Sequence, residues 1–319
     1  MHKTAPVRLS YLCLILLTFI SLDSAFAQSW ENLTFPGRAT LTGASFLSDD
    51  TGYVSTSEGQ CAKTVDGGRK WSIFQVAFGR HFEDLDFLSA NLGFICGRKG
   101  TVYKTFDGGQ RWVNISVPDS ICWLLSIEFF NAGTGIVTGM TREANIPARG
   151  VSYRTTDGGK SWQKQASMGL GYGDLLNRTG KPLMLLSYGQ LHESRDSGKS
   201  WTTIKTTQGK PARSLAVSGQ NGIMVGNNGM CAVSADGGKA WDTVVVNIKN
   251  HLTSVAMVSP LSAYIAGVQG TMMFTGDGGL TWTKEEIPKT FDIFDLALTN
   301  TRLFAIGSKG SILSKNLKR

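Results

Sequence analysis

Six aspartates recur along this sequence in one short pattern, D-[GS]-G-x-x-W. Carboxylates at fixed positions could serve acid–base catalysis or hold a metal ion. The intervals between successive aspartates are 41, 50, 39, 40 and 41 residues, which assigns one copy to each structural repeat. A repeat in every unit separates these side chains in space, so we expect a structural role, with no catalytic residue and no metal ligand among them. The aspartate and tryptophan of each copy are Asp66 and Trp71, Asp107 and Trp112, Asp157 and Trp162, Asp196 and Trp201, Asp236 and Trp241, and Asp277 and Trp282.

The residue types of the pattern suit a tight turn. A short carboxylate accepts hydrogen bonds from nearby backbone, and glycine adopts the positive φ that such a turn demands. The tryptophan then begins a strand and covers the turn with its ring. A second marker is a glycine seven residues before each aspartate, continued at the C-terminal end by Gly310: Gly59, Gly100, Gly150, Gly189, Gly229 and Gly270.

Each repeat reads as four short strands. In the second unit the runs Phe82–Phe87, Leu92–Gly97, Thr101–Thr105 and Trp112–Val117 alternate or are apolar, and turn residues separate them. Four strands in about 40 residues, repeated radially, are typical of a β-propeller. Residues Ser29–Leu33 resemble the tryptophan-led strands, so they complete the last unit. We predict an all-β, seven-bladed β-propeller of four-stranded antiparallel blades, the last blade closed by an N-terminal strand.

The first 27 residues predict a secretory signal peptide and residues 28–319 the single propeller domain. Lys3 and Arg8 precede an apolar run, and Ala25–Ala27 forms an A-x-A site, so cleavage is expected near Ala27–Gln28. A membrane anchor is the alternative, but about 14 apolar residues are short for a span. No later run is long enough to span a membrane. The mature protein is therefore expected to be exported, periplasmic or secreted, and monomeric.

Composition narrows the class further. The chain has 319 residues, 38 of them glycine, 41% hydrophobic and 18% charged residues, and a formal net charge of +8. This balance excludes a disordered protein, and the glycine content fits many turns. Nucleic acid is disfavoured as a partner because the protein is expected outside the cytoplasm. Beyond the signal, four widely spaced cysteines without a C-x-x-C pair argue against a disulfide framework, and no cofactor or metal is expected.

Function is expected on the non-repeated loops. The loops that enter each first strand and those between second and third strands share one face, while the aspartate turns lie on the other. On the first face Arg and Lys outnumber Asp and Glu, and aromatic residues accompany them. Such a surface favours a protein or acidic peptide segment, with an anionic glycan as an alternative. The partner-binding candidates are Arg38, Arg80, His81, Arg98, Lys99, Trp123, Arg142, Arg149, Tyr172, Arg213, His251 and Phe291.

A glycoside hydrolase remains an alternative. Such an enzyme needs two carboxyl groups about 5 to 10 Å apart. The non-repeated acids that a pocket could bring together are Glu83, Asp84, Glu143, Asp174 and Asp292.

The repeated pattern resembles the Asp-box, or BNR repeat, as in Thr64-Val65-Asp66-Gly67-Gly68-Arg69-Lys70-Trp71. Asp-box sialidases share it, but no F-R-I-P segment precedes the first copy. The whole mature chain resembles the Ycf48-type photosystem II assembly factors, on the segment Gly97-Arg98-Lys99-Gly100-Thr101-Val102 followed by Thr105-Phe106-Asp107-Gly108-Gly109. This resemblance implies a compact, exported, seven-bladed ring that binds a partner chain, partly through a basic patch, and catalyses no reaction.

Overall fold

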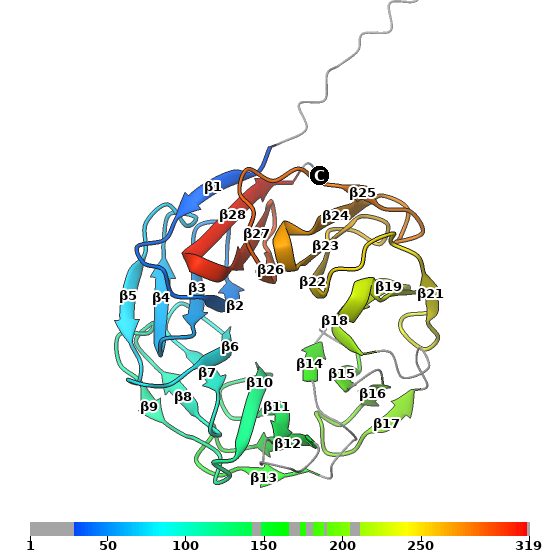
Figure 1. Ribbon diagram of the computed structural model, residues 1–319. Coiled ribbons are helices and arrows are strands. Elements are labelled where there is room, and N and C mark those ends of the chain that lie inside the picture. Colours follow the sequence, from blue (N-terminus) through cyan, green and yellow to red (C-terminus); the bar gives the residue numbers. More distant parts are fainter. Residues whose placement is uncertain are drawn as a thin grey trace, which may run out of the picture.

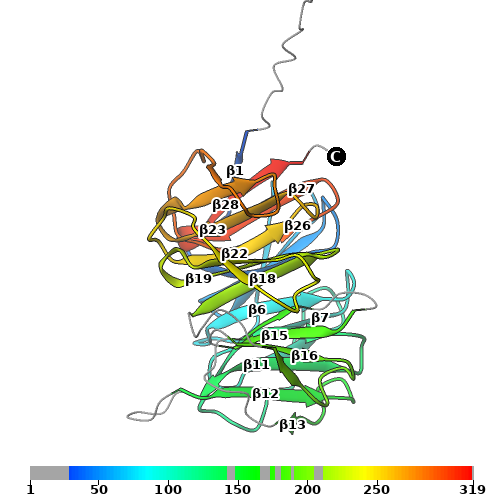
Figure 2. The same cartoon turned by 90° about the vertical axis from the view of Figure 1, so that its right-hand side faces the viewer.

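The computed structural model describes residues 29–141, 148–165, 173–176, 181–187, 190–204 and 211–317. Within these ranges the chain forms seven four-stranded antiparallel sheets arranged as blades around a central axis (Figure 1). Figure 2 shows the ring turned by 90°. The predicted all-β, seven-bladed propeller is therefore confirmed. The signal peptide predicted for residues 1–27 lies outside the described residues.

The first strand of each blade lines the central channel, and the second strand packs behind it. The channel strands are β2 (Leu41–Phe46), β6 (Phe82–Phe87), β10 (Cys122–Phe129), β14 (Gly173–Leu176), β18 (Ala212–Ser218), β22 (Leu252–Met257) and β26 (Ile293–Leu298). The second strands are β3 (Gly52–Thr56), β7 (Gly93–Gly97), β11 (Gly135–Thr141), β15 (Leu183–Ser187), β19 (Asn221–Gly226), β23 (Ala263–Gly267) and β27 (Arg302–Gly307).

Two further strands complete each blade toward the rim. The third strands are β4 (Gln60–Thr64), β8 (Val102–Thr105), β12 (Gly150–Thr155), β16 (Gln190–Ser194), β20 (Cys231–Ser234), β24 (Met272–Thr275) and β28 (Ser311–Asn316). The outermost strands are β5 (Ser72–Gln75), β9 (Val113–Asn114), β13 (Gln163–Lys164), β17 (Thr202–Ile204), β21 (Asp242–Val244), β25 (Thr283–Lys284) and, in the last blade, β1 (Glu31–Thr34). Short 3₁₀ turns separate second and third strands in three blades: η1 (Asn227–Gly229), η2 (Val268–Gly270) and η3 (Ser308–Gly310).

The N-terminal strand closes the ring as predicted. Strand β1 pairs antiparallel with β28, so segments from opposite ends of the chain share one sheet (Figure 1). Trp30, Leu33 and Phe35 around β1 are all buried. The buried Arg302 on β27 donates from Nη1 to the carbonyl oxygen of Gly67 in the first blade at 3.0 Å. Closure therefore combines strand pairing, apolar packing and a cross-blade hydrogen bond.

Neighbouring blades are held together by apolar contacts between their flat faces. In three places an aromatic ring on a second strand stacks on a ring of the next channel strand, and in one of them, at the ring closure, the centroids of Phe304 and Phe46 lie 3.9 Å apart. The ring centroids of Phe94 and Phe129 lie 3.4 Å apart, and those of Tyr53 and Phe87 lie 3.5 Å apart. The four cysteines Cys61, Cys96, Cys122 and Cys231 are free and buried in the same interfaces.

The six Asp-box turns have one hydrogen-bond pattern. In the first blade Asp66 Oδ1 accepts the N–H of Lys70 at 2.8 Å, and Thr64 Oγ1 accepts the N–H of Gly68 at 2.9 Å. The same two bonds recur in the five other turns. These bonds hold the aspartates to their own turns, which supports the structural role expected of them.

Two details of the repeat differ from the prediction. The run Trp112–Val117 is a strand only over β9, because Ser116 Oγ takes the place of a backbone acceptor for Val102 N–H. Four Asp-box tryptophans donate from Nε1 to a glycine carbonyl of their own turn. Trp162 instead donates to Ile115 of the preceding blade at 2.6 Å, and Trp201 Nε1 is buried without a partner in the described residues.

The loops fall on two faces, as expected. Arg98 N–H, in a turn between second and third strands, donates to His81, and Gly310 N–H donates to Ala39, so these turns lie beside the loops that enter channel strands. We call this the top face. The Asp-box turns lie on the opposite face, where Gly67 N–H donates to Asp50 in a turn between first and second strands. None of the helices in the described ranges is long and apolar enough to cross a membrane.

Candidate functional site

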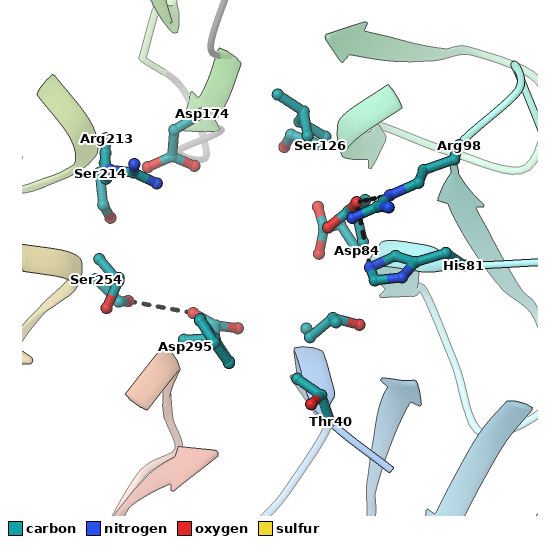
Figure 3. Close-up of a pocket in the computed structure, with 16 residues that line it drawn as sticks. Thr40, His81, Asp84, Arg98, Ser126, Asp174, Arg213, Ser214, Ser254 and Asp295 are labelled. Atoms are coloured by element: carbon teal, nitrogen blue, oxygen red, sulfur yellow. Dashed lines mark hydrogen bonds and ion pairs between the residues drawn. The ribbon is translucent and has the colours of Figure 1, made fainter. Parts of the chain in front are cut away.

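The channel contains a cavity of about 410 Å³. Figure 3 shows charged and hydroxyl side chains from several blades pointing into it. Most of the residues that line it are of polar or charged type: Thr40, Thr42, Gly43, His81, Glu83, Asp84, Arg98, Leu125, Ser126, Asp174, Arg213, Ser214, Thr253, Ser254, Phe294 and Asp295. A polar hollow on the axis of the ring is therefore the main candidate site in the described part of the chain.

β-Bulges place many of these side chains in the channel. The pairing register with the second strand shifts near the start of β2, β6, β10, β18, β22 and β26. A bulge inserts one extra residue, so two consecutive residues line the cavity from each of these strands. Because channel strands begin at the top face, the first residue of each pair lies nearer that face. We call these residues the outer tier (Thr42, Glu83, Leu125, Arg213, Thr253 and Phe294) and the following ones the inner tier (Gly43, Asp84, Ser126, Ser214, Ser254 and Asp295), to which Asp174 of β14 also belongs.

The inner-tier carboxylates bridge neighbouring blades. Asp84 Oδ2 accepts the N–H of Ile127 at 3.0 Å, Asp174 Oδ2 that of Leu215 at 3.0 Å, and Asp295 Oδ2 that of Ala44 at 3.1 Å. Ser254 Oγ accepts the N–H of Leu296 at 3.1 Å in the same manner. Each acceptor thus satisfies a backbone donor that a channel strand would otherwise leave unpaired.

Burial changes the acidity of these carboxyl groups. Desolvation, helped by the charges of Asp295 and Asp174, raises the pKa of Asp84 to about 8, against the effect of the Ile127 N–H. Desolvation and the charge of Asp295 raise the pKa of Asp174 to about 7, and desolvation also raises the pKa of Asp295. Asp84 is partly accessible from the channel, while protein surrounds it in other directions. The inner tier therefore holds protons more tightly than ordinary carboxyl groups do.

A charged cluster stands at the top of the cavity. Arg98 Nε lies 3.0 Å from Glu83 Oε1, and His81 Nε2 lies 3.3 Å from the same oxygen. The Arg98 guanidinium carbon lies 4.3 Å from the ring centroid of Trp123, close enough for a cation–π contact. On the far side of the channel Arg213 Nε donates to Asn227 Oδ1 at 2.5 Å. Two guanidinium groups therefore approach the cavity from different blades (Figure 3).

Most predicted surface residues lie on or near the top face. Arg98 and Trp123 come together, whereas Arg38, Arg149 and His251 stand on separate blades. The exposed candidates are Arg38, Lys99, Arg149, Arg213 and His251, and the partly exposed ones are Arg80, His81, Arg98 and Trp123. Arg142 and Tyr172 lie outside the described residues.

Phe291 was predicted to lie on the partner-binding surface, and this prediction is wrong. Its side chain is only 6% exposed and belongs to the core between the last two blades, because the carbonyl of Phe291 pairs with Gly270 N–H and its ring turns inward. It therefore offers no aromatic surface to a partner. Phe78, which the sequence reasoning passed over, is 88% exposed beside Arg80 on the top face.

Asp84 and Asp174 of the inner tier were named in the sequence analysis, but Asp295 was not. The signal was a second repeated pair: Asp84-Leu85, Asp174-Leu175 and Asp295-Leu296. The leucines are buried in the core while the aspartates face the channel, as alternation along a strand requires.

The remaining acids weighed for hydrolysis have partners of their own. Glu83 pairs with Arg98, and Asp292 Oδ1 accepts the N–H of Gln269 at 2.8 Å. Glu143 lies outside the described residues. Among the residues that the structure covers, no three His, Cys, Asp or Glu side chains gather closely enough to hold a metal ion. The geometry thus assigns Asp84 and Asp174 to inter-blade bridges.

Comparison with known proteins links the whole ring to one family. The family model described as "Photosynthesis system II assembly factor YCF48" matches residues 22–315. The photosystem II assembly protein Ycf48 of Thermosynechococcus vestitus is 28% identical over 297 residues, covering 89% of this chain and 84% of that protein. The photosystem II assembly lipoprotein Ycf48 of Picosynechococcus is 26% identical over 179 residues, so that match spans about half of each chain.

Solved structures share the fold. A structure titled "YCF48 bound to D1 peptide" has a TM-score of 0.74 at 22% identity and covers 91% of this chain and 97% of its own. A structure of YCF48 from Cyanidioschyzon merolae has a TM-score of 0.73 at 16% identity, covering 90% of this chain and 99% of its own. At these identities the likeness establishes the arrangement of blades.

Proposed function

This chain belongs to the Ycf48 family of photosystem II assembly factors, and on that premise we propose that it is a non-catalytic scaffold that binds a segment of a partner protein. The observation that carries the proposal is that a Ycf48 protein of the same fold has been solved bound to a D1 peptide. A ring of this kind offers a fixed surface around which a partner chain can fold or assemble. The acid–base groups that a hydrolase would need are occupied in structural hydrogen bonds, which supports a binding role.

The top face is the proposed binding surface. It presents basic side chains that reach solvent from several blades: Arg38, Arg80, Lys99, Arg149 and Arg213. Guanidinium groups recognise carboxylates with paired hydrogen bonds, and lysines add attraction over a longer range. We therefore infer that the bound segment is acidic.

Exposed aromatic surface gives the same face an apolar anchor. Phe78 projects beside Arg80 with 88% of its surface exposed, and Trp123 lies partly exposed under Arg98. Aromatic and arginine side chains dominate binding energy at protein interfaces. The preferred partner segment thus combines acidic residues with at least one apolar side chain.

The proposed place of action is outside the cytoplasm. The relatives from Picosynechococcus and Trichormus variabilis are named lipoproteins, which are exported proteins. This supports the export expected from residues 1–27, with cleavage near Ala27–Gln28 or lipid attachment as the two forms to be distinguished. Mass spectrometry of the N-terminal peptide from the native host separates them.

A direct test measures binding of a fluorescent D1-derived peptide. The triple variant Arg80→Glu, Lys99→Glu and Arg213→Glu is expected to lose at least about tenfold in affinity, because three favourable charges become repulsive. Fluorescence anisotropy at low and moderate salt reports the loss, and thermal unfolding should be nearly unchanged.

The matched control reverses three charges on the opposite face. Arg69→Glu, Lys70→Glu and Lys239→Glu changes net charge equally but touches only exposed Asp-box residues. Affinity within about twofold of the parent is expected for this control. Equal losses in both triple variants would reduce the effect to net charge, and an unaffected top-face variant would refute the proposed surface.

A further inference from the structure

The channel cavity separates charges of opposite sign along its axis. Three carboxylates of the inner tier, Asp84, Asp174 and Asp295, come from the second, fourth and seventh blades, so they surround the axis. Nearer the top face the same cavity is lined by the guanidinium groups of Arg98 and Arg213 and by the Glu83 carboxylate that pairs with Arg98, so the formal charge of this zone remains positive. Figure 3 shows Arg98 and Asp84 on one side, Arg213 and Asp174 on the other, and Asp295 on a third.

Neither a simple cation nor a simple anion matches this arrangement. A small cation drawn to the carboxylates has guanidinium groups beside it in the cavity, and an anion drawn to those groups has the carboxylates beyond. A bare metal ion is disfavoured as well, because no three candidate ligands among the described residues lie close enough to one another to coordinate it. A ligand with an ammonium group at one end and a carboxylate at the other satisfies both charged zones at once.

We propose that the channel binds such a zwitterion, with its ammonium group at an inner-tier carboxylate (Asp84, Asp174 or Asp295) and its carboxylate at one of the guanidinium groups of Arg98 and Arg213. The ligand is either a free amino acid or the end of a partner chain that terminates in lysine, since both carry an ammonium group and a carboxylate. This site lies inside the ring and goes beyond the proposed capture of an acidic segment on the top face.

The rest of the lining suits such a ligand. Ser126, Ser214 and Ser254 place hydroxyl groups in the inner tier, and these can accept hydrogen bonds from an ammonium group. Leu125 and Phe294 of the outer tier provide apolar surface for a chain of methylene groups. The volume of about 410 Å³ lies within the range of small-molecule sites and exceeds what one amino acid fills.

The test compares three probes of equal chain length by calorimetry with the intact mature protein: 6-aminohexanoate, hexylamine and hexanoate. The measurements are made near pH 9, where the raised pKa of Asp84, about 8, still leaves its carboxylate charged. We expect 6-aminohexanoate to bind at least about tenfold more tightly than either single-charge probe, since each lost charge removes charge-assisted hydrogen bonds. Equal binding of hexylamine or hexanoate, or no binding by any probe, would overturn the proposal.

Variants separate the two zones. The double variant Asp174→Asn/Asp295→Asn keeps an oxygen acceptor at each bridge. It should lower the affinity for 6-aminohexanoate by about tenfold or more and leave the affinity for hexanoate unchanged. Arg213→Gln should weaken 6-aminohexanoate while leaving hexylamine no weaker. The matched control is Asp242→Asn on the outermost strand β21, where the side chain is exposed and remote from the channel. Circular dichroism checks that each variant folds. If the folded channel variants bind 6-aminohexanoate as tightly as the parent does, the proposed channel site is wrong.

Two peptides distinguish the ligand's source. The first is an N-acetylated peptide that ends in lysine with a free C-terminal carboxylate, so it carries both charges at its end. The second is the same peptide with a C-terminal amide, which lacks the carboxylate. Tighter binding of the acid form than of free 6-aminohexanoate identifies a partner's chain end, and the reverse identifies a free amino acid. The Asp174→Asn/Asp295→Asn variant should still bind the acidic peptide on the top face, so failure of this site and failure of the proposed function give different results.

Discussion

Raising the pH should destabilise this ring through the carboxyl groups of its channel. Burial raises the pKa of Asp84 to about 8 and that of Asp174 to about 7, whereas in the unfolded chain both are expected near 4. A group whose pKa is higher in the folded state favours folding while it stays protonated. Its contribution is complete below about pH 4 and is lost as the pH rises through the folded-state value.

The size of the effect follows from proton counting. Between pH 5 and 7 each folded carboxyl group still holds a proton that the unfolded chain has released. The free energy of unfolding therefore falls by about 1.4 kcal/mol per pH unit for each group. Asp84 and Asp174 together set an upper limit near 5 kcal/mol over this range, a large part of a typical domain stability of about 5–15 kcal/mol. Because Asp84 is partly accessible from the channel, its charge is partly screened, and we expect roughly half of that limit.

The assay is urea unfolding of the parent and of Asp84→Asn at pH 5, 6, 7 and 8. Asparagine resembles the protonated acid and retains an oxygen for Ile127 N–H, so the two proteins should be nearly equally stable at pH 5. At pH 8 the variant should exceed the parent by about 1–3 kcal/mol, because it avoids a buried charge facing Asp174 and Asp295. Other titrating groups act on both proteins and cancel in the difference.

Two results would contradict the raised pKa of Asp84. A stability difference between parent and Asp84→Asn that stays constant from pH 5 to 8 would mean that Asp84 titrates as an ordinary surface carboxyl group. A variant that loses more stability at pH 8 than at pH 5 would mean that the charged carboxylate stabilises the ring. The exposed Asp242→Asn variant supplies the baseline and should follow the parent at every pH.

Three further predictions concern the scaffold. Leu33→Ala in the closing strand should cost about 2–4 kcal/mol in urea unfolding, since it leaves a cavity between the end blades, whereas Leu298→Ala, 38% exposed, should cost under about 1 kcal/mol; similar losses would contradict the closure argument. Lys309→Asn should increase the free energy of unfolding by about 0.3–1 kcal/mol and so raise the melting temperature slightly, because Lys309 has a φ of 58° ahead of Gly310 and asparagine tolerates this conformation better. A lower melting temperature would show that the lysine makes a stabilising contact. Thiol reagent should react with the native protein only on unfolding, because burial raises the pKa of every thiol in the set; fast native labelling would place one at the surface. That set is Cys61, Cys96, Cys122 and Cys231.

The scaffold could be predicted because its signals are local and repeated. Asp66 and Trp71 mark a turn whose hydrogen bonds lie within a few residues, so the same letters recur wherever the turn does. Spacing then gave the number of blades. The split last blade could be predicted from Trp30, which begins a strand like the other repeated tryptophans but is not preceded by an Asp-box turn.

The channel was harder to predict because its contacts join residues about 40 positions apart. Asp84 meets Ile127 and Asp174 meets Leu215 across a blade boundary, and nothing adjacent in the sequence marks these pairs. Phe291 was misplaced for a related reason. A loop position predicts exposure. The segment that enters a channel strand also packs against the neighbouring blade, however, and burial of the Phe291 ring in that apolar interface is more favourable than its exposure to water.

The pairing of β1 with β28 also affects how this molecule gains and loses its structure. Hydrogen bonds between Glu31–Thr34 and Ser311–Ser314 join segments nearly 300 residues apart, so they form only after almost the whole chain is available. Such long-range contacts slow folding, because the chain must lose much of its freedom before they form. Once formed, they place β28 between β1 and β27, and it cannot fray from an edge. A ring closed in this way is expected to unfold rarely and as a unit.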